Sequence, residues 1–466
     1  MPSKLFVVPC LLLFAATLAA EEDRAVSYYR DVRPILQANC QGCHQPAKQG
    51  GEYVMTDFAK LIAGGESGDA AIVPGKPDES YLVSVITPTD GEAEMPKGKP
   101  PLSETDRKTI NLWISQGAKD DTPASARPLF DQDHPPVYEL PPVLTSVEYS
   151  PDGSLLAVSG YHEVLLHKAD GSGIAKRLVG MSERIESARF SPNGEKLVVA
   201  GGSPGRLGEL QMWDVASGQL DYSVPVSYDT IYGGSWSPDG KQVAVGCGDN
   251  TVRVFNADTG EQVLFNGAHE DWALDTTFSK DGSHLVSVSR DMTMKLYEVK
   301  TERFIDNITS ITPGALKGGI AAVMRHPTED QLLIGGADGV PKIYKMFREK
   351  DRKIGDDFNL IRAFPALPGR LYDVAFSPDA ALVAACSSDD QKGAIRLFQT
   401  ADGKQLRELL GQKGPVYSIA FSPDGKQLAS VGFDGVVRIN QVEDGSLVHE
   451  FSAVPLTGQT VSTSGK

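Results

Sequence analysis

The chain has 466 residues, a formal net charge of −16 and a pI of about 5.0. This length is too great for one small hydrophobic core and allows two or more domains. The acidic balance disfavours nucleic acid as a partner, because nucleic-acid binding depends on neutralising phosphates with lysine and arginine. A content of 5 cysteines also excludes a small scaffold that is held together by disulfides.

The first residues predict a secretory signal peptide. Lys4 supplies a positive charge, and the apolar run after it ends in small residues just before the sequence EEDR. The run is shorter than the roughly 20 residues that span a bilayer, so we favour a cleaved signal over a membrane anchor. We therefore expect residues 1–20 to be removed together with Cys10. The mature protein should be exported to the periplasm or an equivalent extracytoplasmic compartment, and we expect no transmembrane segment in it.

Residues 21–120 have the pattern of short helices joined by glycine- and proline-rich loops. Apolar residues at helical spacing predict a first helix in VSYYRDVRPILQANC. The sequence TDFAKLIAGG predicts a second helix that is capped by Thr56 or Asp57 and stopped by two glycines, and DESYLVSVI predicts a third. The fourth is the clearest, with Ser103 as its N-cap and Gly117 as its stop.

Residues 121–140 are rich in proline and aspartate and lack periodicity, which predicts a linker. After it, a turn sequence of the form FSPDG recurs along the chain. The third residues of its copies stand at positions 151, 192, 238, 280, 327, 378 and 423. A repeat of this length, with short apolar runs that predict four strands in each unit, is typical of a propeller blade. We therefore predict seven blades over residues 141–452, followed by a tail at residues 453–466.

Residues 141–452 resemble the WD-repeat propellers in their pattern of turns and strands. The signature dipeptide is weak, because residues 213 and 214 form the only Trp-Asp pair in the sequence. In the fourth unit, His269 and Asp291 stand where the resemblance places a buried hydrogen-bond network. We therefore expect His269 to have a structural role.

The short sequence CQGCH places Cys40 and Cys43 three residues apart, with His44 directly after the second cysteine. Four interpretations compete. A zinc site needs four ligands, and no second cysteine pair is present in the sequence. A thioredoxin-like redox pair needs a βαβ pattern, which is not visible. A disulfide between the two cysteines would leave His44 unexplained. The fourth is c-type haem attachment, in which both thiols bond to one edge of the porphyrin and the next residue places its imidazole under the iron.

Met95 favours the haem interpretation. Haem iron in a cytochrome often takes a methionine as its sixth ligand. Met95 lies in the irregular, proline-rich stretch EMPKGKPP, where a methionine is poorly suited to filling a core. Met55 is the competing residue, but it stands just before a short helix, where a packing methionine is ordinary. We expect Met95 to be the distal ligand.

Residues 27–119 as a whole resemble the planctomycete-type cytochrome c domain. The resemblance rests on RDVRPILQANCQGCHQP, on GGESGDAAIVPGKPDESYLVSVI and on EMPKGKPPLSETDRKTINLWISQGA. It implies one covalently attached haem c that is held by Cys40 and Cys43, with His44 and Met95 as the ligands of the iron. Similar proteins fuse such a domain to a WD-type propeller.

The predicted fold is therefore multidomain, with a small all-α cytochrome c domain followed by an all-β seven-bladed propeller. The predicted function is one-electron transfer by an exported single-haem cytochrome that has a redox partner protein, while the propeller serves as a platform for a protein partner. The alternative is a periplasmic oxidoreductase whose propeller houses a second active site. Histidines after the linker are scattered without a motif, so we favour an electron-transfer protein over an enzyme. Lys97 and Lys99 follow Met95, and two interpretations stay open: ordinary solvated lysines of a loop, which we favour, or a positive docking surface for an acidic redox partner.

Overall fold

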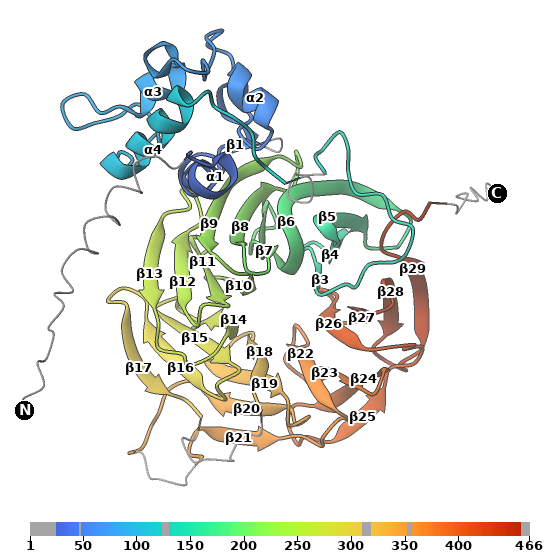
Figure 1. The fold of residues 1–466 in the computed structure, drawn as a ribbon. Helices are drawn as coiled ribbons and strands as arrows, with labels where there is room; N and C mark the ends of the chain where they lie inside the picture. Colours follow the sequence, from blue (N-terminus) through green and yellow to red (C-terminus); the bar gives the residue numbers. More distant parts are fainter. Residues whose placement is uncertain (1–24, 46–47, 124–129, 310–317, 352–356, 458–466) are drawn as a thin grey trace, which may run out of the picture. The chain divides into compact units, whose positions relative to one another are not determined.

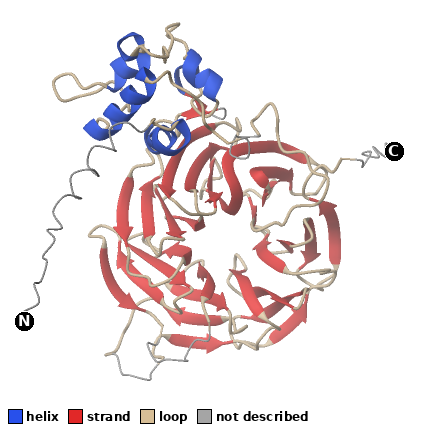
Figure 2. Cartoon of the chain, in the orientation of Figure 1, coloured by secondary structure: helices blue, strands red, loops and turns tan. Residues whose placement is uncertain are grey.

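The computed structural model describes residues 25–45, 48–123, 130–309, 318–351 and 357–457. The predicted signal peptide lies outside the described residues. Two compact units divide the described chain. The first comprises residues 25–45 and 49–123, and the second comprises Lys48 and the described residues from 130 onward. Short helices build the first unit and antiparallel sheets build the second, so the predicted change from helix to strand is confirmed (Figure 2). None of the helices in the described part of the chain has the length and apolar character needed to cross a membrane.

Short elements follow one another through the first unit. They are η1 (Tyr28–Val32), α1 (Arg33–Asn39), β1 (His44–Gln45), β2 (Lys48–Gln49), η2 (Gly50–Glu52), α2 (Phe58–Ala63), η3 (Pro77–Glu79), α3 (Tyr81–Ile86) and α4 (Glu104–Ser115). Two α-helices begin at side-chain caps. Asp57, rather than Thr56, caps α2 by accepting a hydrogen bond of 2.9 Å from the backbone N–H of Lys60. Ser103 caps α4 by accepting one of 3.1 Å from Asp106 N–H. These caps satisfy N–H groups that have no partner inside a helix.

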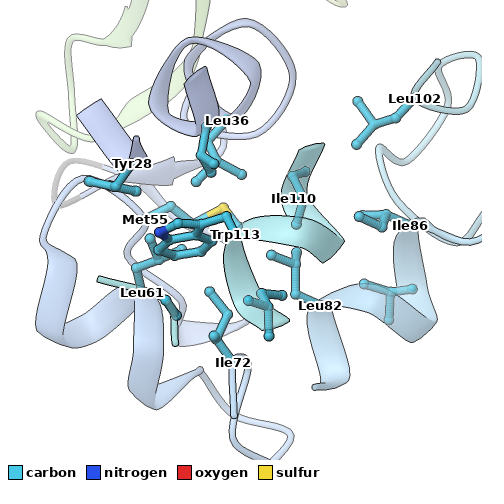
Figure 3. Close-up of a cluster of buried hydrophobic side chains, with 14 residues drawn as sticks. Tyr28, Leu36, Met55, Leu61, Ile72, Leu82, Ile86, Leu102, Ile110 and Trp113 are labelled. Atoms are coloured by element: carbon cyan, nitrogen blue, oxygen red, sulfur yellow. The ribbon is translucent and has the colours of Figure 1, made fainter. Parts of the chain in front are cut away.

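One hydrophobic cluster holds the first unit together (Figure 3). Tyr28, Val32 and Leu36 repeat every fourth residue and are all buried, although the first turn of this helix is a wider π turn. The ring of Tyr28 stacks on the buried ring of Trp113 with centroids 5.3 Å apart. Burial of side chains of this size contributes roughly 1.5–3 kcal/mol each. The first unit therefore has a core of its own.

The first seven strands of the second unit form one antiparallel sheet in chain order. They are β3 (Val147–Tyr149), β4 (Leu155–Ser159), β5 (Tyr161–Lys168), β6 (Ile174–Phe190), β7 (Lys196–Ser203), β8 (Leu207–Asp214) and β9 (Leu220–Ser227). The long strand β6 pairs with two neighbouring strands. Its residues 174–179 pair with β5, its residues 185–190 pair with β7, and Arg184 between them pairs with both.

The other strands of the second unit form five separate four-stranded sheets, each in chain order. They are β10 (Ile231–Trp236), β11 (Gln242–Cys247), β12 (Val252–Asn256), β13 (Gln262–Asn266), β14 (Ala273–Phe278), β15 (His284–Ser289), β16 (Met294–Glu298), β17 (Arg303–Asn307), β18 (Ile320–Arg325), β19 (Gln331–Gly336), β20 (Lys342–Lys345), β21 (Leu360–Ala363), β22 (Arg370–Phe376), β23 (Leu382–Asp389), β24 (Lys392–Gln399), β25 (Gln405–Glu408), β26 (Val416–Phe421), β27 (Gln427–Gly432), β28 (Val436–Gln441) and β29 (Leu447–Ser452).

The innermost strands of the second unit form a closed ring (Figure 1). In order, the ring consists of β3, β6, β10, β14, β18, β22 and β26, and β26 contacts β3. The recurring Ser-Pro-Asp-Gly turn links an inner strand to the next strand of its sheet. In one copy, Ser237 donates its hydroxyl to Asp239 at 2.7 Å, and Gly240 has a φ of +71°, which favours glycine. The repeat found in the sequence thus marks the ends of inner strands.

Two segments beyond the predicted propeller range belong to the second unit. Tyr138, near the end of the predicted linker, is buried and donates its hydroxyl to Glu163 at 2.7 Å. Ala453, in the predicted tail, is also buried, and Thr457 donates its backbone N–H to the carbonyl of Tyr138 at 2.9 Å. The two ends of the second unit therefore meet, which the composition of these segments did not predict.

Candidate functional site

The CQGCH sequence forms one tight turn at the end of α1. The backbone N–H of Cys40 donates to the carbonyl of Leu36 at 2.8 Å. The N–H groups of Cys43 and His44 then donate to the carbonyl of Cys40 at 3.1 and 3.2 Å. Because Leu36 is fully buried, this turn is anchored to the core of the first unit. The structure thus brings three of the predicted site residues together.

The two thiols of this turn have different surroundings. Cys43 is exposed, whereas Cys40 is half-buried and packs against the hydrophobic cluster, and both thiols are free. Burial raises the pKa of Cys40 to about 12, although the nearby ammonium of Lys99 opposes the shift. The disulfide considered from the sequence is therefore not formed. Among the described residues, no three His, Cys, Asp or Glu side chains group as a metal site.

His44 presents an imidazole that is half-buried and incompletely bonded. Its ring lies edge-on to the ring of Tyr53, with centroids 5.5 Å apart. Its Nδ1 atom is buried and has no hydrogen-bond partner among the described residues. Burial lowers the pKa of His44, which keeps the imidazole neutral at pH 7. The neutral ring is the form that binds a metal ion.

The two candidate methionines occupy different places. Met95 follows α3, donates its backbone N–H to the carbonyl of Val85 at 2.9 Å, and packs half-buried against the same cluster as Cys40. Met55 is only 2% exposed and lies within the cluster (Figure 3). Its backbone N–H donates to the carbonyl of His44 at 2.8 Å. Met55 is therefore a core residue, whereas Met95 lies at the edge of the core.

The loop that carries Met95 also approaches the cysteine turn. Lys99, four residues after Met95, acts electrostatically on the thiol of Cys40. Lys97 and Lys99 are both exposed. The donor set is two free thiols, an imidazole with an unpartnered buried nitrogen, and a thioether on the shared apolar cluster. Thiols and imidazole in one turn, with a thioether nearby, fit the chemistry of a c-type haem.

Two neighbours of His44 were not singled out from the sequence. Tyr53 holds its ring against the imidazole and donates its hydroxyl to the carbonyl of Leu61 at 2.7 Å. Gly50 donates its N–H to the carbonyl of Cys43 at 2.9 Å, and a Cβ at this position would lie 3.1 Å from that oxygen. No sequence signal marks either residue, because the chain must first fold back after β1 to bring them to His44.

In the second unit, the structure confirms the structural role predicted for His269. Its Nδ1 lies 2.8 Å from a carboxylate oxygen of Asp291, and its Nε2 lies 2.6 Å from the hydroxyl of Ser287. The same hydroxyl donates to Tyr297 at 3.3 Å. This buried network connects the turn before β14 to β15 and β16.

Comparisons with known proteins agree with both units. Residues 40–98 match the family model described as Planctomycete cytochrome C. Residues 222–256, 260–298, 359–392 and 403–439 match the family model described as WD domain, G-beta repeat. The chain thus combines a planctomycete cytochrome c domain with WD repeats.

Curated relatives resemble the chain over part of its length. It is 25% identical to the WD repeat-containing protein 26 homolog of Arabidopsis thaliana over 300 residues, which is 63% of this chain and 47% of that protein. It is 25% identical to Periodic tryptophan protein 2 of the same plant over 267 residues, covering 57% and 28% of the two chains. It is 21% identical to the Eukaryotic translation initiation factor 3 subunit I of Kluyveromyces lactis over 285 residues, which is 58% of this chain and 69% of that protein. The chain therefore spans less than half the length of the first two relatives.

Proposed function

We propose that this protein is an exported single-haem cytochrome c that transfers one electron at a time to or from a partner protein. The CQGCH turn carries the proposal, because it combines two free thiols with an imidazole nitrogen that has no partner among the described residues, and because Cys40 of this turn packs on the same apolar cluster as Met95. When haem is bound, its iron supplies the ferric and ferrous states between which one electron is exchanged.

Each residue of the turn has a definite role in this proposal. Cys40 and Cys43 would hold the porphyrin through thioether bonds, and His44 and Met95 would be the iron ligands. A methionine opposite a histidine raises the reduction potential compared with histidine alone. The apolar cluster beside Cys40 and Met95 would raise it further, because a low-dielectric surrounding disfavours added charge.

We further propose that the second unit is a seven-bladed propeller. The five four-stranded sheets supply five blades. The seven-stranded sheet supplies two more, because the two parts of β6 pair with different neighbours and each completes a set of four strands. The ring of inner strands and the seven copies of the turn sequence support the same count.

An apolar face of this propeller supports its role as a protein-binding platform. Each set of four antiparallel strands has two loops at one end. One loop joins the second strand to the third, and the other joins the fourth strand to the first strand of the next set. Large exposed side chains gather in these two kinds of connection: Tyr228 (82% exposed), Trp272 (36%), Met292 (42%), Leu410 (63%) and Phe433 (58%). Trp272 also stacks on Tyr232 and carries the guanidinium of Arg290 4.6 Å above its ring. Apolar side chains that are exposed at one end of the ring would offer contacts to a protein partner.

The test is performed on the protein purified from an exporting host. Acid–acetone extraction should leave the haem on the polypeptide, and the variant with Cys40→Ser and Cys43→Ser should lose it. The intact mass should show removal of residues 1–20. Release of haem from the wild-type chain would refute covalent attachment. A single c-type spectrum supports electron transfer alone, whereas an additional chromophore in the propeller would favour the oxidoreductase alternative.

A further inference from the structure

A cavity of about 380 Å³ lies at the centre of the ring of inner strands. All seven inner strands, or the turns that follow them, contribute to its wall. Sites for small molecules usually enclose about 300–1,000 Å³. The cavity is therefore large enough for a small organic ligand.

The charged groups of this cavity are mainly acidic. Its wall contains Glu148 on β3, Asp275 on β14, Asp373 on β22 and Arg189 on β6. Three carboxylates and one guanidinium give a formal charge of −2 when all four are ionised. The three carboxylates come from separate strands around the ring. An anionic ligand would be repelled by this surrounding, whereas a ligand with two separated positive charges would complement it.

Backbone hydrogen bonds hold the carboxylates in place. Asp275 accepts one of 2.9 Å from the N–H of Val323, and Asp373 accepts one of 2.9 Å from the N–H of Ile419. Glu148 likewise accepts from a backbone N–H of the next inner strand. A carboxylate has about four acceptor sites, so each of the three keeps capacity for a ligand after these bonds are made.

A second feature of the cavity also points to a ligand. Tyr149 lines the cavity with only 7% of its surface exposed, and its hydroxyl has no hydrogen-bond partner within the described chain. A buried hydroxyl without a partner is unfavourable, because its lost hydrogen bond to water is not replaced. The wall next to it is apolar and contains Phe190, Trp236, Phe376 and Phe421.

We propose that this axial cavity binds a small organic dication of the linear diamine class. Its two ammonium groups would pair with carboxylates on different inner strands, and its methylene chain would lie against the aromatic wall. The spread of the carboxylates around the ring favours two separated charges over a single metal ion. This site is independent of the haem and of electron transfer.

Binding of a dication should release protons. Burial raises the pKa values of Glu148 and Asp275 to about 7, and burial also raises the pKa of Asp373, while Arg189 opposes all three shifts. A positive ligand stabilises the ionised carboxylates and so lowers these pKa values. The carboxyl groups that are protonated near pH 7 therefore lose protons when the dication enters.

The test uses isothermal titration calorimetry of the full-length holoprotein with 1,4-diaminobutane at pH 7. Titrations in two buffers of different ionisation enthalpy measure the protons released. We expect saturable binding of one diamine per chain with proton release, and at least tenfold weaker binding in Asp275→Asn and in Asp373→Asn. Asp229→Asn is the matched control. Asp229 also accepts backbone N–H groups, from Gly205 and Thr230, but it does not line the cavity, so its variant should bind like the wild type.

A variant that strengthens binding separates a ligand site from a purely structural cluster. Arg189→Gln removes the positive charge and should tighten diamine binding several-fold, which a loss of folding cannot do. Thermal unfolding of each variant checks the fold. Absence of saturable binding in the wild type, equal binding by Asp275→Asn and Asp229→Asn, or binding of calcium ions without binding of diamine would each overturn the proposal.

Discussion

Backbone hydrogen bonds, rather than side-chain contacts, determine how the residues proposed to bind haem are presented. The carbonyl of Cys40 accepts from both Cys43 and His44, and this fixes the directions in which their side chains leave the turn. Tyr53 then limits rotation of the His44 ring from one side. Met95 reaches the same cluster from a separate loop. At the residue scale, the two proposed iron ligands are therefore supplied by one turn and one loop.

The first prediction concerns Met95. Met95→Ala should abolish the weak absorption near the red end of the ferric spectrum that thioether ligation produces, and it should lower the reduction potential. Absorption spectroscopy and redox titration measure the two effects. The matched control is Met55→Leu, because Met55 is buried and its replacement by alanine would leave a cavity. A volume-conserving change costs less than about 1.5 kcal/mol, so this control should keep both signals. Loss of the band in Met55→Leu alone would reassign the ligand.

The second prediction concerns the buried network of His269. Burial by itself raises the pKa of Asp291, but hydrogen bonds from His269 and Thr293 outweigh it and hold that pKa below its ordinary value. His269→Ala would leave this buried carboxylate and the hydroxyl of Ser287 short of a partner. We expect a loss of about 2–5 kcal/mol in the unfolding free energy of the propeller, measured with urea, and an unchanged haem spectrum. A loss below about 0.5 kcal/mol would show that the network contributes nothing to stability.

At the scale of elements, local caps and turns define where strands and helices begin and end. Ser103 satisfies a free N–H at the start of α4, and the Ser-Pro-Asp-Gly turns repeat one hydrogen-bond pattern at the ends of inner strands. The caps and turns use residues that are close in sequence. The bond from the serine to the aspartate or asparagine recurs in six of the seven copies, whereas the copy with His326 and Thr328 is bonded differently.

The third prediction tests one such cap. Ser103→Ala should reduce the stability of the helical unit by about 1 kcal/mol, because the N–H of Asp106 loses its acceptor. Thermal unfolding followed through the haem absorbance measures this unit separately from the propeller. Ser115→Ala is the control, since it makes the same substitution near the other end of α4 at an exposed position. If the two variants are equally stable, the cap has no energetic role.

At the scale of the whole molecule, the two units have separate hydrophobic clusters. The second unit also closes on itself, because Tyr138 and Thr457 join its beginning to its end. Each unit should therefore behave as an independent folding unit.

The fourth prediction follows from these separate cores. A fragment of residues 130–466 should fold without haem and unfold cooperatively in urea, since it retains Tyr138 and its partner Glu163. A fragment that begins at residue 141 lacks Tyr138 and should be less stable, because Glu163 loses a buried partner. Circular dichroism and intrinsic fluorescence give the two transitions. An insoluble or non-cooperative 130–466 fragment would show that the propeller depends on the cytochrome unit.

The fifth prediction concerns encounter with a redox partner. Lys97 and Lys99 are exposed beside Met95 in an acidic protein. Electron exchange with an acidic redox partner should slow as ionic strength rises, and the variant with Lys97→Glu and Lys99→Glu should slow it further at low salt. Stopped-flow absorbance measures the rate. Lys76→Glu with Lys108→Glu makes the same change in charge at other exposed positions and should have a smaller effect. Wild-type rates in the first double variant would place the docking surface elsewhere.

The sequence by itself determined the features that depend on neighbouring residues. It located the helices, the cap at Ser103, the repeated turns and the CQGCH motif. The buried pair of His269 and Asp291, which are 22 positions apart, was expected from the resemblance to WD-repeat propellers. The cap and the turns were confirmed because each is built from residues a few positions apart, whereas haem attachment at the CQGCH motif stays a prediction. The burial of Tyr138 and Ala453 was not predicted, since it depends on the meeting of distant segments.

Only the tertiary structure decided which distant residues meet. Tyr53 reaches His44 because the chain folds back after β1, and no periodicity records that contact. The axial cavity is the stronger case, because Glu148, Asp275 and Asp373 stand far apart in the sequence, each in an ordinary strand pattern. Their proximity arises from closure of the ring, and closure also buries them and raises their pKa values. The clustering of these three carboxylates is a property of the closed ring, and no local sequence pattern predicts it.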